Sequence, residues 1–80
     1  MEYVDKKIPE KISSTDTYPD GANCPTTIDV HKCFCGAGEI EHHYIRGFAD
    51  DYYIIRCKKC KRKHSDVIDR IGDMWRVYLK

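Results

Sequence analysis

Two short segments, Cys33-Phe34-Cys35-Gly36 and Cys57-Lys58-Lys59-Cys60, decide the fold of this chain. Each segment places two cysteines close together, and 21 residues separate the two pairs. Two close cysteine pairs on either side of a hairpin-length insert are the spacing from which a chain builds a tetrahedral site of four thiolates. The sequence therefore predicts a bound metal ion, Zn²⁺, with four ligands: Cys33, Cys35, Cys57 and Cys60. Iron–sulfur and disulfide chemistry are the alternatives.

A chain this short has a small core, and a bound metal ion can supply the stability that such a core lacks. Eighty residues form one domain with a small core, and five cysteines are many for that size. The odd cysteine count and the absence of a basic, apolar start at Met1 to Asp5 disfavour a secreted disulfide framework. No apolar run approaches the roughly 20 residues of a membrane span. We expect a cytoplasmic protein with no membrane partner.

The residues between and after the cysteine pairs predict antiparallel β-hairpins. Residues 39–45 alternate between apolar and polar side chains, residues 46–51 have turn composition, and residues 52–57 are rich in β-favouring side chains. In residues 65–80 we expect a second hairpin with its turn at Gly72-Asp73, and a short helix is the alternative. In either case Trp75 is expected to be a core residue.

The first 30 residues have a different composition from the rest. Residues 13–27 are mostly Ser, Thr, Asp, Asn, Gly and Pro, and Pro19-Asp20-Gly21 is a turn signal. Residues 1–30 carry a net charge of −3, whereas residues 31–80 carry +4. We therefore predict an irregular N-terminal arm over residues 1–30 and a metal-stapled, mainly β domain over residues 31–80.

The cysteine pattern resembles that of the zinc ribbon family. The span Cys33-Phe-Cys35-Gly36 to Cys57-Lys-Lys-Cys60 is also similar to small phage and prophage zinc-ribbon proteins, which add a tryptophan-containing C-terminal element. The resemblance covers about residues 31–80 and implies two cysteine turns, or knuckles, at the end of a small antiparallel sheet. The first knuckle here is Cys-x-Cys where the family usually has Cys-x-x-Cys, which makes Cys24 or His31 an alternative ligand.

A run of basic residues surrounds the second cysteine pair. Together with two nearby tyrosines, it could follow a phosphate backbone and stack nucleobases. The candidate nucleic-acid-binding residues are Lys58, Lys59, Lys61, Arg62, Lys63, Tyr52 and Tyr53. The competing interpretation is local electrostatics, since positive charge beside a thiolate cluster stabilises the deprotonated ligands.

The sequence predicts a non-catalytic zinc-binding module that binds DNA or RNA or acts as a regulator. A protein-binding adaptor or inhibitor of phage origin is the first alternative. A degenerate HNH-like nuclease is the second, because His42-His43 lies between the cysteine pairs and His64 follows them. The insert after His43 is short for that fold and contains no asparagine. We therefore expect no enzymatic activity, and the sequence specifies neither a partner nor an oligomeric state.

Overall fold

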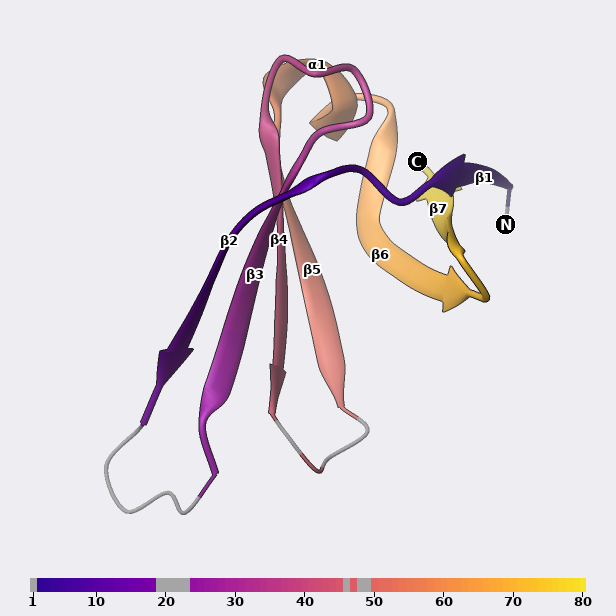
Figure 1. Cartoon of the computed structure of the whole chain (residues 1–80). Coiled ribbons are helices and arrows are strands. Elements are labelled where there is room, and N and C mark those ends of the chain that lie inside the picture. The colour runs from indigo at the N-terminus through magenta and orange to yellow at the C-terminus, as the bar shows by residue number, and fades with distance from the viewer. Residues whose placement is uncertain (1, 19–23, 46, 48–49) are drawn as a thin grey trace.

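The computed structural model describes residues 2–18, 24–45, 47 and 50–80, and it consists of two antiparallel sheets. The first sheet has the order β2-β3-β4-β5, and the second has the order β1-β7-β6 (Figure 1). The larger sheet contains β2 (Lys11–Thr17), β3 (Thr26–Lys32), β4 (Glu39–Ile45) and β5 (Asp51–Arg56). The smaller contains β1 (Tyr3–Lys7), β6 (His64–Ile71) and β7 (Met74–Leu79), and a short helix, α1 (Lys58–Lys61), follows β5. The prediction of a small, mainly β protein is confirmed.

The hairpin predicted between the cysteine pairs is present as β4 and β5. Its register pairs Ile40 with Ile55 and His42 with Tyr53. Consecutive residues of a strand face opposite sides of the sheet, so Ile40, Tyr53 and Ile55 share one face, and all three are buried. We call this the inner face. The cysteine turns lie at one end of the hairpin, at the top of Figure 1.

The C-terminal segment is the predicted β-hairpin and not the alternative helix. Strands β6 and β7 pair antiparallel, with Ile71 opposite Met74 across the turn at Gly72-Asp73. Gly72 has a φ of 62°, which glycine adopts without steric cost at the first position of a two-residue hairpin turn. Trp75 and Val77 alternate toward the core along β7.

The core lies between the inner face of the larger sheet and the smaller sheet. Trp75 is only 2% exposed, and its ring packs edge-to-face against Tyr53 at 5.2 Å between centroids. The same ring contacts His31 at 4.9 Å and Phe34 at 6.1 Å. The prediction that Trp75 is a core residue is therefore confirmed.

The expectation of an irregular arm over residues 1–30 is wrong. Strand β1 pairs with β7, β2 pairs with β3, and β3 runs across the predicted boundary between residues 30 and 31. All seven residues of β2 are exposed, so this strand leaves no hydrophobic alternation in the sequence. It pairs with β3 through the backbone ladder and through side-chain hydrogen bonds, such as that from Ser14 to Asp29 at 2.6 Å. The turn predicted at Pro19-Asp20-Gly21 lies outside the described residues.

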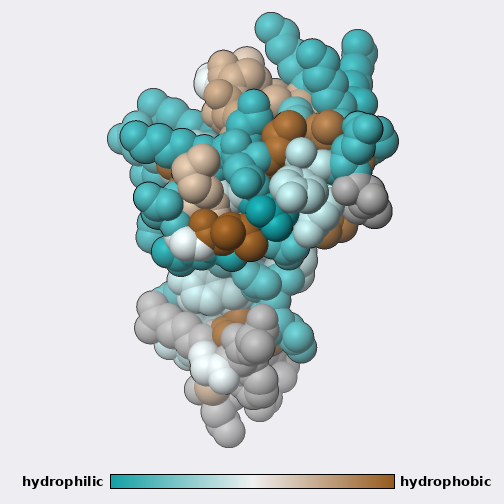
Figure 2. Space-filling model, turned by 90° about the vertical axis from the view of Figure 1, so that its right-hand side faces the viewer, coloured by the Kyte–Doolittle hydropathy of each residue, from teal (hydrophilic) through white to brown (hydrophobic). Residues whose placement is uncertain are grey.

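The surface on the side of the smaller sheet is mostly hydrophilic. Figure 2 shows this side, where apolar residues form separate patches among polar ones. The exposed apolar side chains of this sheet include Tyr3, Val67 and Ile71. Helix α1 has four residues, and none of the described helices has the length and apolar character needed to cross a membrane.

Candidate metal centre

The first cysteine knuckle is the connection between β3 and β4. Cys33 follows β3 directly, and its backbone N–H donates to the carbonyl of Gly38 at 2.8 Å. The N–H of Gly36 donates to the carbonyl of Cys33 at 2.9 Å, and Gly36 has a φ of 75°. Glycine adopts this left-handed conformation readily, so the chain can reverse within two residues of a ligand.

Gly38 is needed for a different reason, which is the close approach of the second knuckle. A Cβ atom at this position would lie 2.5 Å from the Cβ of Cys57 and 2.9 Å from the carbonyl oxygen of Arg56. The absence of a side chain therefore allows the two knuckles to approach each other.

The second knuckle starts where β5 ends and continues into α1. The N–H of Lys61 donates to the carbonyl of Cys57 at 2.8 Å, and the N–H of Lys63 donates to that of Cys60 at 3.0 Å. These hydrogen bonds form a single helical turn, which orients Cys57 and Cys60 toward the first knuckle. The basic side chains between and after them remain exposed.

The four sulfur atoms form one compact cluster. Sγ of Cys33 lies 3.1 Å from that of Cys60, and Sγ of Cys35 lies 3.4 Å from that of Cys57 and 3.7 Å from that of Cys60. All four lie within 4.8 Å of one another. Four sulfur atoms bound tetrahedrally to one ion, with metal–sulfur bonds of about 2.3 Å, lie about 3.8 Å from one another. The two sulfur atoms of a disulfide, in contrast, lie about 2.05 Å apart. None of the five cysteines forms a disulfide, and the donor set fits a metal ion.

The environment of the thiols differs from one cysteine to the next. Cys33, Cys57 and Cys60 are buried, while Cys35 is exposed. Burial raises the pKa of the Cys33 and Cys60 thiols. A hydrogen bond with the backbone of Cys60 lowers the pKa of Cys57 to about 7. Because a metal binds thiolates, its binding must displace the protons of the remaining thiols.

The two alternative ligands lie outside the cluster. His31 is 8% exposed, its Nδ1 donates to the carbonyl oxygen of Pro9 at 2.9 Å, and its ring packs against Trp75. Cys24 is half-buried and does not belong to the cysteine group. The Cys-x-Cys spacing therefore places both of its sulfurs in the cluster without a substitute.

The predicted nucleic-acid-binding residues divide into three locations. The five bases of the second knuckle are all exposed: Lys58, Lys59, Lys61, Arg62 and Lys63. Tyr53 is only 5% exposed and stacks on His42 at 4.2 Å between centroids, so its ring is not available to a nucleobase. Tyr52 is 57% exposed but lies four residues before the end of β5, on the opposite face of the sheet.

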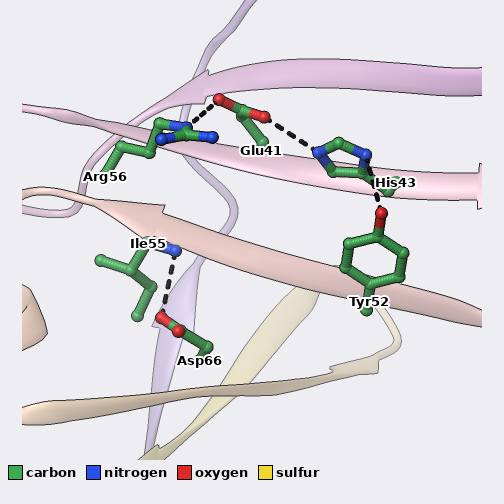
Figure 3. Close-up of polar contacts among 6 residues, drawn as sticks. All are labelled: Glu41, His43, Tyr52, Ile55, Arg56 and Asp66. Carbon is green, nitrogen blue, oxygen red and sulfur yellow. Dashed lines mark hydrogen bonds and ion pairs between the residues drawn. The ribbon is translucent and has the colours of Figure 1, made fainter.

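That opposite, outer face carries a chain of polar contacts, shown in Figure 3. Glu41 contacts Arg56, and it also contacts His43 with 2.9 Å between Oε1 and Nε2. The hydroxyl of Tyr52 lies 3.2 Å from Nδ1 of His43, and their rings stack. Burial alone would raise the pKa of Glu41, but its contacts with His43 and Arg56 lower it overall.

The adjacent histidines lie on opposite faces of β4. His42 is on the inner face, where its Nε2 lies 2.7 Å from the carboxylate of Asp51, and His43 is on the outer face. A cavity of about 520 Å³ lies beside His42, between the two sheets, and Tyr53, Arg70 and Trp75 contribute to its walls. The two histidines therefore do not form one site.

Sequence reasoning missed two residues near the centre. Asp66 of β6 accepts a hydrogen bond from the N–H of Ile55 at 3.2 Å and so connects the two sheets (Figure 3). Lys6 of β1 lies beside the knuckles, together with Phe34 and Cys35. No local pattern could identify either residue, because each depends on the packing of one sheet against the other.

Comparison of the chain with family models, curated proteins and solved structures gave no match.

Proposed function

We propose that this protein is a zinc-binding module of the zinc-ribbon type that binds nucleic acid through its second knuckle and has no catalytic role. Sulfur-only coordination in a tetrahedral arrangement is typical of Zn²⁺ or of iron, and not of the oxygen-preferring Mg²⁺ and Ca²⁺. Four cysteine ligands leave no open position for water or substrate, as is typical of structural zinc. Cys33, Cys35, Cys57 and Cys60 would hold the ion, which would fix the two knuckles against each other.

The observation that carries the binding proposal is the concentration of exposed bases on the knuckle. Five bases occur in residues 58–63, and all five are exposed. Four thiolates around a divalent ion carry a charge of about −2, so the local charge remains positive after the cluster is counted. Exposed bases in one turn can contact adjacent phosphates, and each contact releases a counterion. The expected binding is weak and tolerant of sequence, because nothing on this turn is arranged to read base edges.

The test compares the native protein with two charge variants. Binding of labelled DNA and RNA oligonucleotides is measured by fluorescence anisotropy at about 50 and 200 mM salt, where phosphate contacts differ strongly in strength. The variant Lys61→Ser/Arg62→Ser should bind more weakly. The fall of log K with log salt concentration should also be less steep for it, by about 1.5 to 2 in the slope. The control Lys11→Ser/Arg70→Ser removes the same charge from exposed residues beside the cavity between the sheets, and it should bind like the native protein.

Both parts of the proposal can fail. Elemental analysis of protein purified without added metal should give about one zinc per chain, and iron or no metal would contradict the zinc assignment. If the native protein binds neither DNA nor RNA at about 50 mM salt, the bases serve only to stabilise the thiolates. The protein-binding adaptor would then be the better explanation of the fold.

A further inference from the structure

The surface beside the metal centre contains two adjoining hollows that share two residues. One, of about 300 Å³, is lined by Lys6, Phe34, Cys35, Lys59, Cys60, Lys63 and His64. The other, of about 410 Å³, continues along the connection between β1 and β2. Phe34 and Lys6 line both hollows. We call the two together the knuckle groove.

Phe34 is the aromatic residue of this groove. It lies between the two cysteines of the first knuckle and is only half-buried. Its ring contacts the rings of Trp75 and His64, each at 6.1 Å between centroids, with interplanar angles of 87° and 66°. Neither neighbour lies parallel to the Phe34 ring, as a stacked base would. The ring is thus held by a buried tryptophan while part of it remains accessible.

Three lysines from different parts of the chain line the same hollow. Lys6 comes from β1, Lys59 from α1 and Lys63 from the segment between α1 and β6. No carboxylate of the described residues forms an ion pair with any of the three. Their ammonium groups are therefore available to an anionic ligand. Proteins bind single-stranded nucleic acid by combining a fixed aromatic side chain with lysine or arginine side chains that form no ion pair within the protein.

We infer that the knuckle groove binds single-stranded nucleic acid, with one unpaired base on Phe34 and the flanking phosphates on Lys6, Lys59 and Lys63. This inference rests on the proposed function and specifies the form of nucleic acid. A base in a duplex has both faces covered by its neighbours, so only a single strand can place a base on the ring. The aromatic contact is therefore Phe34 and not Tyr52, which lies on the outer face with its ring stacked on His43.

The experiment measures binding of a labelled 12-nucleotide thymidine strand, the matching RNA and a 12-base-pair duplex to the zinc-loaded protein. The native protein should bind the single strands more tightly than the duplex. Phe34→Leu keeps an apolar side chain against Trp75 and should weaken single-strand binding about tenfold, because base–aromatic stacking contributes that order of affinity. Tyr52→Leu removes the exposed aromatic side chain of the outer face and should bind like the native protein.

A second variant avoids the packed ring, in case Phe34→Leu disturbs the fold. Lys6→Ser should weaken single-strand binding, while Lys11→Ser removes an equal charge outside the groove and should not. Zinc content is measured for each variant to show that the knuckles remain intact.

The possible outcomes separate the inference from the proposed function. If the native protein binds no nucleic acid, both are wrong. If it binds, but Phe34→Leu and Lys6→Ser bind like the native protein, the knuckle groove is not the binding site and the basic knuckle remains the contact. Equal affinity for the duplex and the single strands would also overturn the inference that the groove binds a single strand. A loss of single-strand binding in Tyr52→Leu alone would do the same.

Discussion

At the scale of single residues, the cysteines are not equivalent, although the sequence contains five of them. Four have sulfurs within 4.8 Å of one another, and Cys24 is not among them. We predict that Cys60→Ser releases the metal and unfolds the protein, because metal binding of order 10 kcal/mol is also folding energy in so small a domain. Cys24→Ser should leave zinc content and melting temperature nearly unchanged. Elemental analysis and thermal melts check both variants, and metal loss in Cys24→Ser would mean that the ligand set is wrong.

Gly38 gives a second prediction at this scale. We expect Gly38→Ala to weaken metal binding strongly, because the new methyl group would overlap the Cβ and backbone of Cys57. The control is Gly72→Ala, where nothing lies within 4 Å of the added Cβ and only the positive φ is strained. That variant should lower thermal stability, by about 1 kcal/mol, but leave metal affinity within a few-fold of native. Competition with a zinc chelator measures the difference, and equal affinities in the two variants would contradict it.

At the scale of the elements, the sequence predicted the β4–β5 and β6–β7 hairpins and missed three other strand pairings of the described residues: β1–β7, β2–β3 and β3–β4. The β4–β5 and β6–β7 hairpins have local signals: β-favouring residues, a short turn and, for the second, glycine at the position of positive φ. Strand β1 pairs with β7, about 70 residues further along the chain, and β2 is an exposed edge strand in which serine and threonine predominate. Neither has a local pattern. Strand β1 depends on a distant partner, and β2 depends on the backbone ladder and on side-chain hydrogen bonds to β3. The cluster of four cysteines was predictable for the opposite reason, since the spacing of these residues in the sequence alone carries the signal.

The contact of Asp66 with β5 gives the prediction that belongs to this scale. Asp66→Ala should lower the free energy of unfolding by about 1 kcal/mol, because the N–H of the buried Ile55 loses its acceptor. Asp66→Asn keeps a side-chain oxygen at this place and should retain most of the stability. Urea unfolding of the zinc-loaded protein measures both variants. If the asparagine variant is as unstable as the alanine variant, charge and not the hydrogen bond is responsible.

At the scale of the whole molecule, the metal centre and the core are one structure. Among the described residues, three of the nine in the core cluster also belong to the cysteine cluster: Cys33, Cys57 and Cys60. Phe34, between Cys33 and Cys35, packs against Trp75, so the first knuckle also covers the central tryptophan. A chain of 80 residues buries little apolar surface without such a staple. The sequence could predict this dependence from length and cysteine count, but not which side of Trp75 the knuckles cover.

Removal of the metal should therefore unfold the chain and not only loosen one end of it. In the folded protein the Cα radius of gyration is 13.1 Å, and an unfolded chain of this length should reach about 28 Å. On addition of a zinc chelator we expect the radius of gyration, measured by small-angle X-ray scattering, to rise toward the larger value. The emission of Trp75, the only tryptophan, should shift to the red as its ring becomes exposed. Zn²⁺ should reverse both changes and Mg²⁺ should reverse neither, because Mg²⁺ prefers oxygen ligands. A chelated chain that keeps its compact radius and its tryptophan emission would show that the two sheets fold without the metal.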